Sequence, residues 1–280
     1  MHARTPAPRP VEVVAHRGAS EEVPEHTLAA YERAIAEGAD ALECDVRLTA
    51  DGHLVCVHDR RINRTSDGHG IVSTKTLAEL DARDFGSWKP PAGATLDGDR
   101  FVVDERRSRV LTLERLLGLV IDSGREVSLA IETKHPTRYA GLVEERVVEV
   151  LRRFGLVPPA DPSWSRVRVM SFSQLSIRRM RVLAPRVPTV FLMERVPLRF
   201  RDGDLPFHAT IAGPSMDIVR AHPGYVARVH DAGHQVHVWT VDRSTDVHLC
   251  LDLGVDAIIT NRPGKVLAQI GRGWPGTSPG

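Results

Sequence analysis

The feature that most limits the fold of this chain is a regular alternation between short β-branched runs and longer stretches with helical periodicity. That alternation is typical of repeated strand–helix units, whose strands form a parallel sheet. Eight runs are predicted to be strands: residues 11–15, 41–45, 128–134, 167–172, 189–193, 210–213, 236–241 and 257–260. Eight units in roughly 250 residues have the size of a TIM (β/α)8 barrel. A doubly wound sheet is the alternative, but the first turn lacks the GxGxxG sequence that favours it.

The stretches between these runs carry helix signals. Thr27 can cap a helix that has Tyr31 on its apolar face, and Gly38 can end it. Apolar residues also recur at helical spacing near residues 113–121 and 139–154. Helices at these places are what a barrel of strand–helix units requires.

One segment departs from the alternation. Residues 53–59 alternate as a strand and follow Asp51-Gly52, which is a hairpin turn signal. In a hairpin centred on these two residues, the sequence positions of any two residues that face each other add up to about 103, so His58 is expected opposite Asp45. Residues 60 to about 110, rich in Gly, Pro, Asp and Arg, are then predicted to form an insertion over the barrel mouth.

The whole barrel is predicted to be one domain of residues 11–270, with flexible tails at residues 1–10 and 271–280.

The chain has 37 Lys and Arg and 36 Asp and Glu, so its formal net charge is only +1, which gives no broad electrostatic field for nucleic acid or an anionic membrane. The three cysteines cannot all pair and lack metal-ligand spacing, which fits a reducing compartment. The N-terminus lacks the apolar core of a secretory signal, and the apolar runs are too short to span a bilayer. We therefore expect a cytoplasmic protein with no nucleic-acid partner and no stable membrane anchor; its oligomeric state is open.

Polar residues follow the first predicted strand at the edge where TIM barrels carry their reactive groups. His16 can transfer protons there, and Arg17 can hold a phosphate or a carboxylate through two hydrogen bonds. A basic surface loop explains these two residues alone equally well.

Two later strand ends carry acidic residues at a spacing that places them on one face. Glu43 and Asp45 are separated by one strand residue, and Glu132 and Lys134 repeat the spacing. Three carboxylates favour one divalent cation, Mg²⁺ or Ca²⁺, and the lysine could offset charge or contact a phosphate. The alternatives are an exposed strand face and a simple Glu132–Lys134 ion pair.

Two further residues complete the candidate site. His58, expected near Asp45, gives with His16 a pair that could supply both the acid and the base of a phosphoryl transfer. Trp239, in the predicted strand 236–241, is expected to form an apolar or stacking wall, or else to belong to the core.

In this order, the residues resemble the glycerophosphodiester phosphodiesterase family. The matching motifs include HRG at 16–18, Pro24-Glu-x-Thr27, Glu43-x-Asp45, Asp51-Gly52, His58-Asp59, Asn63-Arg64-Thr65, Ile131-Glu-Thr-Lys134, Val238-Trp-Thr-Val241 and residues 254–260. The resemblance covers residues 12–268. It implies a TIM barrel with an inserted segment after the second strand, which uses a divalent cation to hydrolyse small-molecule glycerophosphodiesters to sn-glycerol 3-phosphate and an alcohol.

The resemblance also implies a role for each candidate residue. The roles are metal ligand for Glu43, Asp45 and Glu132, acid or base for His16 and His58, and phosphate contact for Arg17 and Lys134. A lysophospholipase D-type phosphodiesterase on the same site and a non-catalytic phosphodiester-binding barrel are the alternatives. Two positions depart from the family: its usual Asn is His26 here, and its usual Asp is Asn261. Both are expected to alter the pocket rim without touching the metal or acid–base residues.

Overall fold

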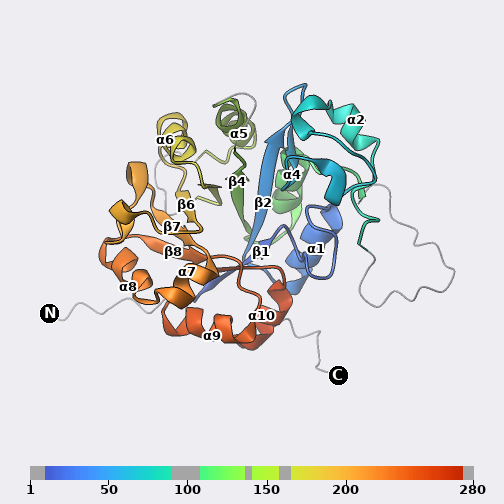
Figure 1. The fold of residues 1–280 in the computed structure, drawn as a ribbon. Coiled ribbons are helices and arrows are strands. Elements are labelled where there is room, and N and C mark those ends of the chain that lie inside the picture. The colour runs from blue at the N-terminus through green and yellow to red at the C-terminus, as the bar shows by residue number, and fades with distance from the viewer. Residues whose placement is uncertain (1–9, 90–107, 136–140, 158–164, 274–280) are drawn as a thin grey trace.

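Eight parallel strands close into a barrel in this computed structural model, which describes residues 10–89, 108–135, 141–157 and 165–273 (Figure 1). The barrel strands are β1 (Glu12–His16), β2 (Ala41–Leu48), β4 (Ser128–Thr133), β5 (Val167–Ser171), β6 (Thr189–Met193), β7 (Ile211–Pro214), β8 (Gln235–Val238) and β9 (Ala257–Thr260). Strand β1 pairs with both β2 and β9, which closes the sheet. The predicted TIM barrel is confirmed.

Helices surround the strands on the outside of the barrel (Figure 1). They are α1 (Leu28–Glu37), α4 (Leu113–Asp122), α5 (Leu142–Arg153), α6 (Gln174–Leu183), α7 (Met216–Ala221), α8 (Gly224–Asp231), α9 (Ser244–Asp252) and α10 (Pro263–Gln269). Helix α1 begins as predicted, because the Thr27 side chain accepts a hydrogen bond from the Ala30 N–H. It ends at Gly38, whose φ of 99° suits a residue without a Cβ. Among the described residues, none of the helices has the length and apolar composition that a bilayer crossing requires.

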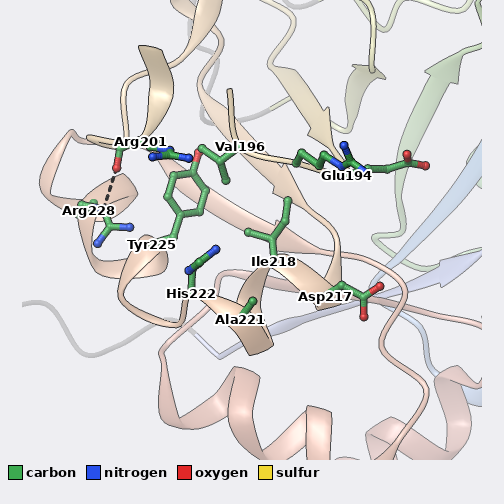
Figure 2. A pocket seen from close by; sticks show the side chains of 10 residues that line it. Glu194, Val196, Arg201, Asp217, Ile218, Ala221, His222, Tyr225 and Arg228 are labelled. Carbon is green, nitrogen blue, oxygen red and sulfur yellow. Dashed lines mark hydrogen bonds between the residues drawn. The ribbon is translucent and has the colours of Figure 1, made fainter. Parts of the chain in front are cut away.

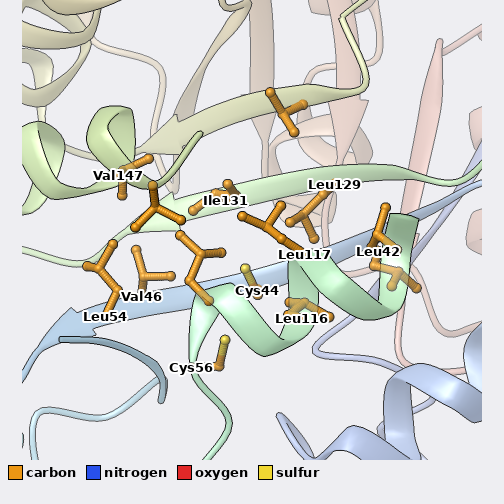
Figure 3. Close-up of a cluster of buried hydrophobic side chains, with 14 of the residues drawn as sticks. Leu42, Cys44, Val46, Leu54, Cys56, Leu116, Leu117, Leu129, Ile131 and Val147 are labelled. Atoms are coloured by element: carbon orange, nitrogen blue, oxygen red, sulfur yellow. The ribbon is translucent and has the colours of Figure 1, made fainter. Parts of the chain in front are cut away.

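The alternation of side chains along β2 separates the core from the site. Leu42 and Cys44 point outward and pack with Leu116 and Leu117 of α4 in a buried apolar layer (Figure 3). The residues between them on β2 point into the barrel, because successive strand residues face opposite sides. Burial of one face against α4 therefore fixes which β2 side chains reach the barrel interior.

The hairpin after β2 has a different register from the predicted one. Strand β3 (Leu54–Cys56) is antiparallel to β2, and Val46 pairs with Cys56, one residue away from the expected pairing. The cause is the turn: the Thr49 N–H donates to the His53 carbonyl across three loop residues, and Gly52 has a φ of 85°. A three-residue loop that ends in a left-handed residue shifts the pairing by one relative to a two-residue turn.

The inserted segment after the second barrel strand is present, as predicted. Residues 60–89 contain 3₁₀ turns at Ile62–Arg64 and Val72–Thr74 and helix α2 (Leu77–Asp81). Their apolar side chains form a small separate core with the hairpin; its members are Val55, Val57, Ile62, Val72, Leu80, Phe85 and Val110. The proposed bounds of the insertion and both tails stay predictions, because residues 1–9, 90–107 and 274–280 lie outside the described part of the chain.

Candidate active site

Seven of the eight predicted site residues line one cavity of about 190 Å³ at the carboxyl ends of the strands. These seven are His16, Arg17, Glu43, His58, Glu132, Lys134 and Trp239. The eighth, Asp45, is buried, with a relative exposure of 1 %. The structure thus brings together side chains from β1, β2, β4 and the segments that follow β3 and β8.

The chain turns sharply between β1 and α1, and this turn places Arg17. Arg17 has a left-handed φ of 58°, and its backbone N–H donates to the Glu43 carboxylate at 3.0 Å. Gly18 follows with a φ of 86°, and a Cβ there would lie 2.6 Å from the carbonyl carbon of Ala30. Only glycine fits so close to α1. The HRG sequence is therefore a tight turn that carries an arginine back over β2.

The three carboxylates form a compact acidic group. Glu43, Asp45 and Glu132 each offer an oxygen, and these oxygens lie within 4.8 Å of one another. Burial and the charge of Asp45 raise the pKa of Glu43 well above its ordinary value, and the same two causes raise the pKa of Glu132 to about 8. Both shifts have the same origin, a concentration of buried negative charge, which a bound cation would relieve. The site therefore fits a hard divalent cation held by oxygen ligands.

Asp45 behaves differently because it is surrounded by donors. Lys134 Nζ lies 3.2 Å from its Oδ1, and Arg17 Nε lies 3.0 Å from its Oδ2. Burial alone would raise the pKa of Asp45. A hydrogen bond from His26 and the charges of Lys134 and Arg17 nevertheless hold this pKa well below its ordinary value. Lys134 also pairs with Glu132 at 2.8 Å, so the simple ion pair considered from the sequence is present, but it lies inside the cavity.

The two predicted acid–base histidines are each held by a polar neighbour. His16 Nδ1 lies 2.7 Å from Asn261 Oδ1, and burial lowers the pKa of His16 to about 4. His58 Nδ1 lies 2.7 Å from Asp59 Oδ1, so the carboxylate favours a proton on Nδ1 and leaves Nε2 free to accept one. Burial also lowers the pKa of His58. Both imidazoles are thus neutral at pH 7 and able to take up a proton.

The two departures from the family motif do contact the predicted site residues, so the expectation that they only alter the rim is wrong. His26 Nε2 donates to Asp45 Oδ2 at 2.9 Å, and its side chain is buried. Asn261 Oδ1 accepts a hydrogen bond from His16 Nδ1, and Asn261 Nδ2 donates to Asp242 Oδ2 at 2.6 Å, which fixes the orientation of the amide. Barrel closure explains the second contact: Asn261 follows β9, which pairs with β1. Nothing in the local sequence marks that neighbourhood.

One wall of the cavity is aromatic and contains Trp239 and Phe172. The Trp239 and Phe172 rings meet edge to face, with centroids 5.3 Å apart. The indole Nε1 donates to the Gly213 carbonyl at 2.7 Å, which fixes the ring. Trp239 is half-buried: it lines the cavity and also packs against a cluster of buried apolar residues from the barrel strands.

A second cavity of about 440 Å³ lies between the loop after β6 and helices α7 and α8 (Figure 2). Glu194 lines both cavities. Figure 2 shows Arg201, Tyr225 and His222 around the outer part of the second cavity, with Glu194 toward the barrel. This space adjoins the site through Glu194.

Known proteins are similar to this chain in sequence and in fold. Residues 16–265 match the glycerophosphoryl diester phosphodiesterase family. The chain is 46% identical to the Mycobacterium tuberculosis protein named probable glycerophosphodiester phosphodiesterase 1, over 92% of each chain. It is 33% identical to a glycerophosphodiester phosphodiesterase of Bacillus subtilis, over 92% of this chain and 85% of that one.

Solved structures agree with this relationship. An Oleispira antarctica phosphodiesterase in complex with the product sn-glycerol-3-phosphate matches with a TM-score of 0.77 and 25% identity, over 93% of this chain and 96% of that one. A glycerophosphodiester phosphodiesterase of Agrobacterium tumefaciens matches with a TM-score of 0.72 and 26% identity, over 92% of this chain and all of that one. From its sequence, its barrel and the residues gathered in its cavity, this chain belongs to the glycerophosphodiester phosphodiesterase family and is a phosphoric diester hydrolase.

Proposed function

We propose that this enzyme hydrolyses glycerophosphodiesters to sn-glycerol 3-phosphate and an alcohol, with one Mg²⁺ or Ca²⁺ held by Glu43, Asp45 and Glu132. The observation that carries the proposal is the group of three buried carboxylates within 4.8 Å of one another in a cavity that also holds two histidines. The product named for the Oleispira antarctica relative supports this reaction. When bound, the cation would withdraw negative charge from the phosphate as the transition state forms.

The cationic side chains of the cavity suit the phosphate. Arg17 can present its guanidinium to phosphate oxygens from the turn after β1, and Lys134 faces the same space from the end of β4. Both are already attracted to Asp45, so their charges are fixed where the anion would bind. Positioned charge of this kind needs little rearrangement during the reaction.

His16 and His58 would move the protons. One imidazole removes the proton from the attacking oxygen, and the other gives a proton to the departing alcohol oxygen as the bond from that oxygen to phosphorus breaks. The nucleophile is either water or the glycerol 2-hydroxyl; attack by the hydroxyl would form a cyclic phosphate that water then opens. Neutral imidazoles at pH 7 suit the base role, and the acid must first receive a proton.

A lysophospholipase D-type reaction on the same site is a second candidate, because apolar side chains are exposed beside the cavity. Phe172, on the cavity wall, is 39% exposed, and Leu175 and Leu198 are 56% and 77% exposed. Arg199 hydrogen-bonds Gln174, which ties the segment after β6 to the first residue of α6. These side chains could contact the acyl chain of a lysophospholipid.

The test is an assay for glycerol 3-phosphate released from glycerophosphocholine by the purified chain. We expect EDTA to abolish release and added Mg²⁺ or Ca²⁺ to restore it. Unchanged turnover after exhaustive chelation would rule out the metal assignment. Binding of glycerophosphocholine without any turnover, at every cation tried, would favour the non-catalytic barrel. Lysophosphatidylcholine in a parallel reaction tests the second candidate through release of lysophosphatidic acid.

A further inference from the structure

Arg64 belongs to a motif that resembles the family sequence, yet the proposed reaction gives it no role. It lies at the end of the 3₁₀ turn Ile62–Arg64, in the inserted segment. Its guanidinium makes four hydrogen bonds to two carboxylates, Asp59 and Glu25. Nε lies 2.7 Å from Asp59 Oδ2, and Nη1 and Nη2 lie 2.8 and 2.7 Å from the two oxygens of Glu25.

Each of these carboxylates in turn holds a residue of the cavity. Asp59 Oδ1 lies 2.7 Å from His58 Nδ1, and Glu25 Oε1 accepts from Arg17 Nη1 at 3.1 Å. Arg64 therefore joins two short chains of charged groups, one that ends at the imidazole of His58 and one that ends at the guanidinium of Arg17. These chains end at residues of two different segments around the cavity, since Arg17 follows β1 and His58 follows β3.

We propose that Arg64 is a positioning residue that fixes His58 and Arg17 relative to each other through Asp59 and Glu25. The inference rests on the proposed function only in treating those two residues as part of the reaction site. The planar fork of an arginine can satisfy two carboxylates at once, whereas the single ammonium of a lysine cannot copy that geometry. Without Arg64, Asp59 would lose the partner that orients it, and the His58 Nδ1 proton would lose its fixed acceptor.

The electrostatics of the two carboxylates agree with this geometry. The hydrogen bond from Arg64 is the main reason that the pKa of Asp59 is lowered to about 2. Burial alone would raise the pKa of Glu25, but the hydrogen bond from Arg64 and the charge of Arg17 lower it to about 2. Both carboxylates therefore stay ionised, and each can act as an acceptor over the whole working range of pH.

The chain contains a matched control. Arg33 also bridges two carboxylates, Glu22 at 3.1 Å and Glu37 at 2.5 Å, and its side chain is 51% exposed against 44% for Arg64. Neither of its partners contacts a cavity residue among the hydrogen bonds of the described chain. Loss of Arg33 removes a comparable surface ion-pair network, which is worth little by itself.

The experiment compares R64A, R64K and R33A in steady-state turnover of glycerophosphocholine by the metal-loaded enzyme. We expect R64A to lower kcat/KM by about 10- to 100-fold, because a small misplacement of reacting groups is costly. R64K should recover part of that loss, and R33A should stay within about 2-fold of wild type. The melting temperatures of R64A and R33A should be similar, which separates positioning from stability.

A mutant cycle tests the route of the effect. If Arg64 acts through Asp59 and Glu25, R64A should lower kcat/KM by a smaller factor in a D59N or an E25Q background than in wild type. In the D59N/E25Q double variant, R64A should cause no further loss of kcat/KM. Full additivity in both backgrounds would overturn the proposal. So would an R64A rate equal to that of R33A.

A measurement without substrate separates this inference from the proposed function. Nitrogen chemical shifts of the His58 ring report its tautomer; we expect mostly Nδ1–H in wild type and in R33A, and a mixed population in R64A. If wild type turns over no glycerophosphodiester, the proposed function fails while this readout still decides the role of Arg64. Identical His58 spectra in R64A and wild type would contradict the positioning role. If R64A does not fold, R64K supplies the same comparison.

Discussion

Single residues in this site owe their properties to the neighbour that holds them. His16 and His58 have the same ordinary pKa and are both only partly buried in the cavity, yet one ring is held by a neutral amide and the other by a carboxylate. Asn261 presents its Oδ1 to His16, because its Nδ2 donates to Asp242, so the oxygen accepts from a protonated Nδ1 of His16. While it is ionised, Asp59 can act only as a hydrogen-bond acceptor, which favours the Nδ1–H tautomer of His58.

The two histidines should therefore act as one acid–base unit. We expect H16A and H58A each to lower kcat by about 10²- to 10⁴-fold, the usual loss for a general acid or base. The fold loss of kcat in the double variant should be much smaller than the product of the two single losses, since residues that act together are non-additive. An activated p-nitrophenol leaving group should rescue only the variant that lacks the acid.

His230 is the control for this series. It pairs with Asp256 at 2.9 Å but does not line the cavity, so H230A should keep its turnover. Equal rescue of H16A and H58A by the activated substrate would show that the two-histidine assignment is wrong.

At the scale of elements, the strand ends are tied to the helices by buried polar contacts. Glu144 of α5 is fully buried, and its Oε1 lies 3.1 Å from His135 Nε2, just after β4, and 3.4 Å from Arg179 Nη1 of α6. This carboxylate links one strand end to two helices. Burial alone would raise its pKa, but hydrogen bonds, chiefly with His135, lower the pKa of Glu144 to about 2.

Replacing Glu144 by glutamine should therefore destabilise the barrel at neutral pH. The ionised carboxylate has a lower pKa folded than unfolded, so its stabilisation is present above the ordinary pKa of 4.5 and is lost as the pH falls through about 2. We expect E144Q to lower the free energy of unfolding by about 2 kcal/mol at pH 7. Urea unfolding at a series of pH values should show the difference from wild type shrinking below pH 4.5. A difference that is constant from pH 7 to pH 3 would contradict this account.

The inserted element should influence which alcohol is accepted. The inserted segment, predicted to span residues 60 to about 110, begins two residues after His58, which lines the cavity, and such loops commonly set specificity. Exchange of this segment for that of a relative, with Arg64 kept, should change the preference among choline, ethanolamine and inositol diesters and leave metal affinity unchanged. If the preference stays fixed, the second cavity is the alternative place for the alcohol, and R195A on its wall should change the preference instead.

For the whole molecule, the acidic group makes stability depend on the cation. Glu43 and Asp45 come from the same strand, but their charges have opposite effects on the metal-free fold. Burial and the neighbouring Asp45 make the charge of Glu43 unfavourable, while His26, Lys134 and Arg17 stabilise the charge of Asp45. A cation that binds only the folded chain stabilises it by mass action, by about 2.7 kcal/mol at a hundred times its Kd.

We therefore expect E43Q and D45N to differ in EDTA. E43Q should raise the free energy of unfolding by about 1 kcal/mol, since it removes a repulsion, and D45N should lower it by about 2 kcal/mol, since it leaves buried cations without a partner. Both variants should lose most of the rise in melting temperature that Mg²⁺ or Ca²⁺ gives wild type. Thermal unfolding with and without cation measures all of this; shifts of the same sign for both variants in EDTA would refute the charge assignment.

The features that local sequence determines are those with a local physical cause. The barrel follows from eight apolar runs that alternate with amphipathic stretches, because each unit can bury its apolar faces only against its neighbours. The shared face of Glu43 and Asp45 follows from the two-residue period of a strand. The start and end of α1 follow from the capping group of Thr27 and the free left-handed conformation of Gly38.

The features that only the tertiary structure decided depend on which segments become neighbours. The hairpin register differs from the predicted one because the turn contains three loop residues, and the Asp51-Gly52 sequence does not specify the length of the loop. Closure of the barrel brings Asn261 against His16, and the turn after β1 brings His26 under Asp45. Contacts between side chains far apart in sequence arise from strand order and loop paths, and neither is written in the spacing of residues along the chain.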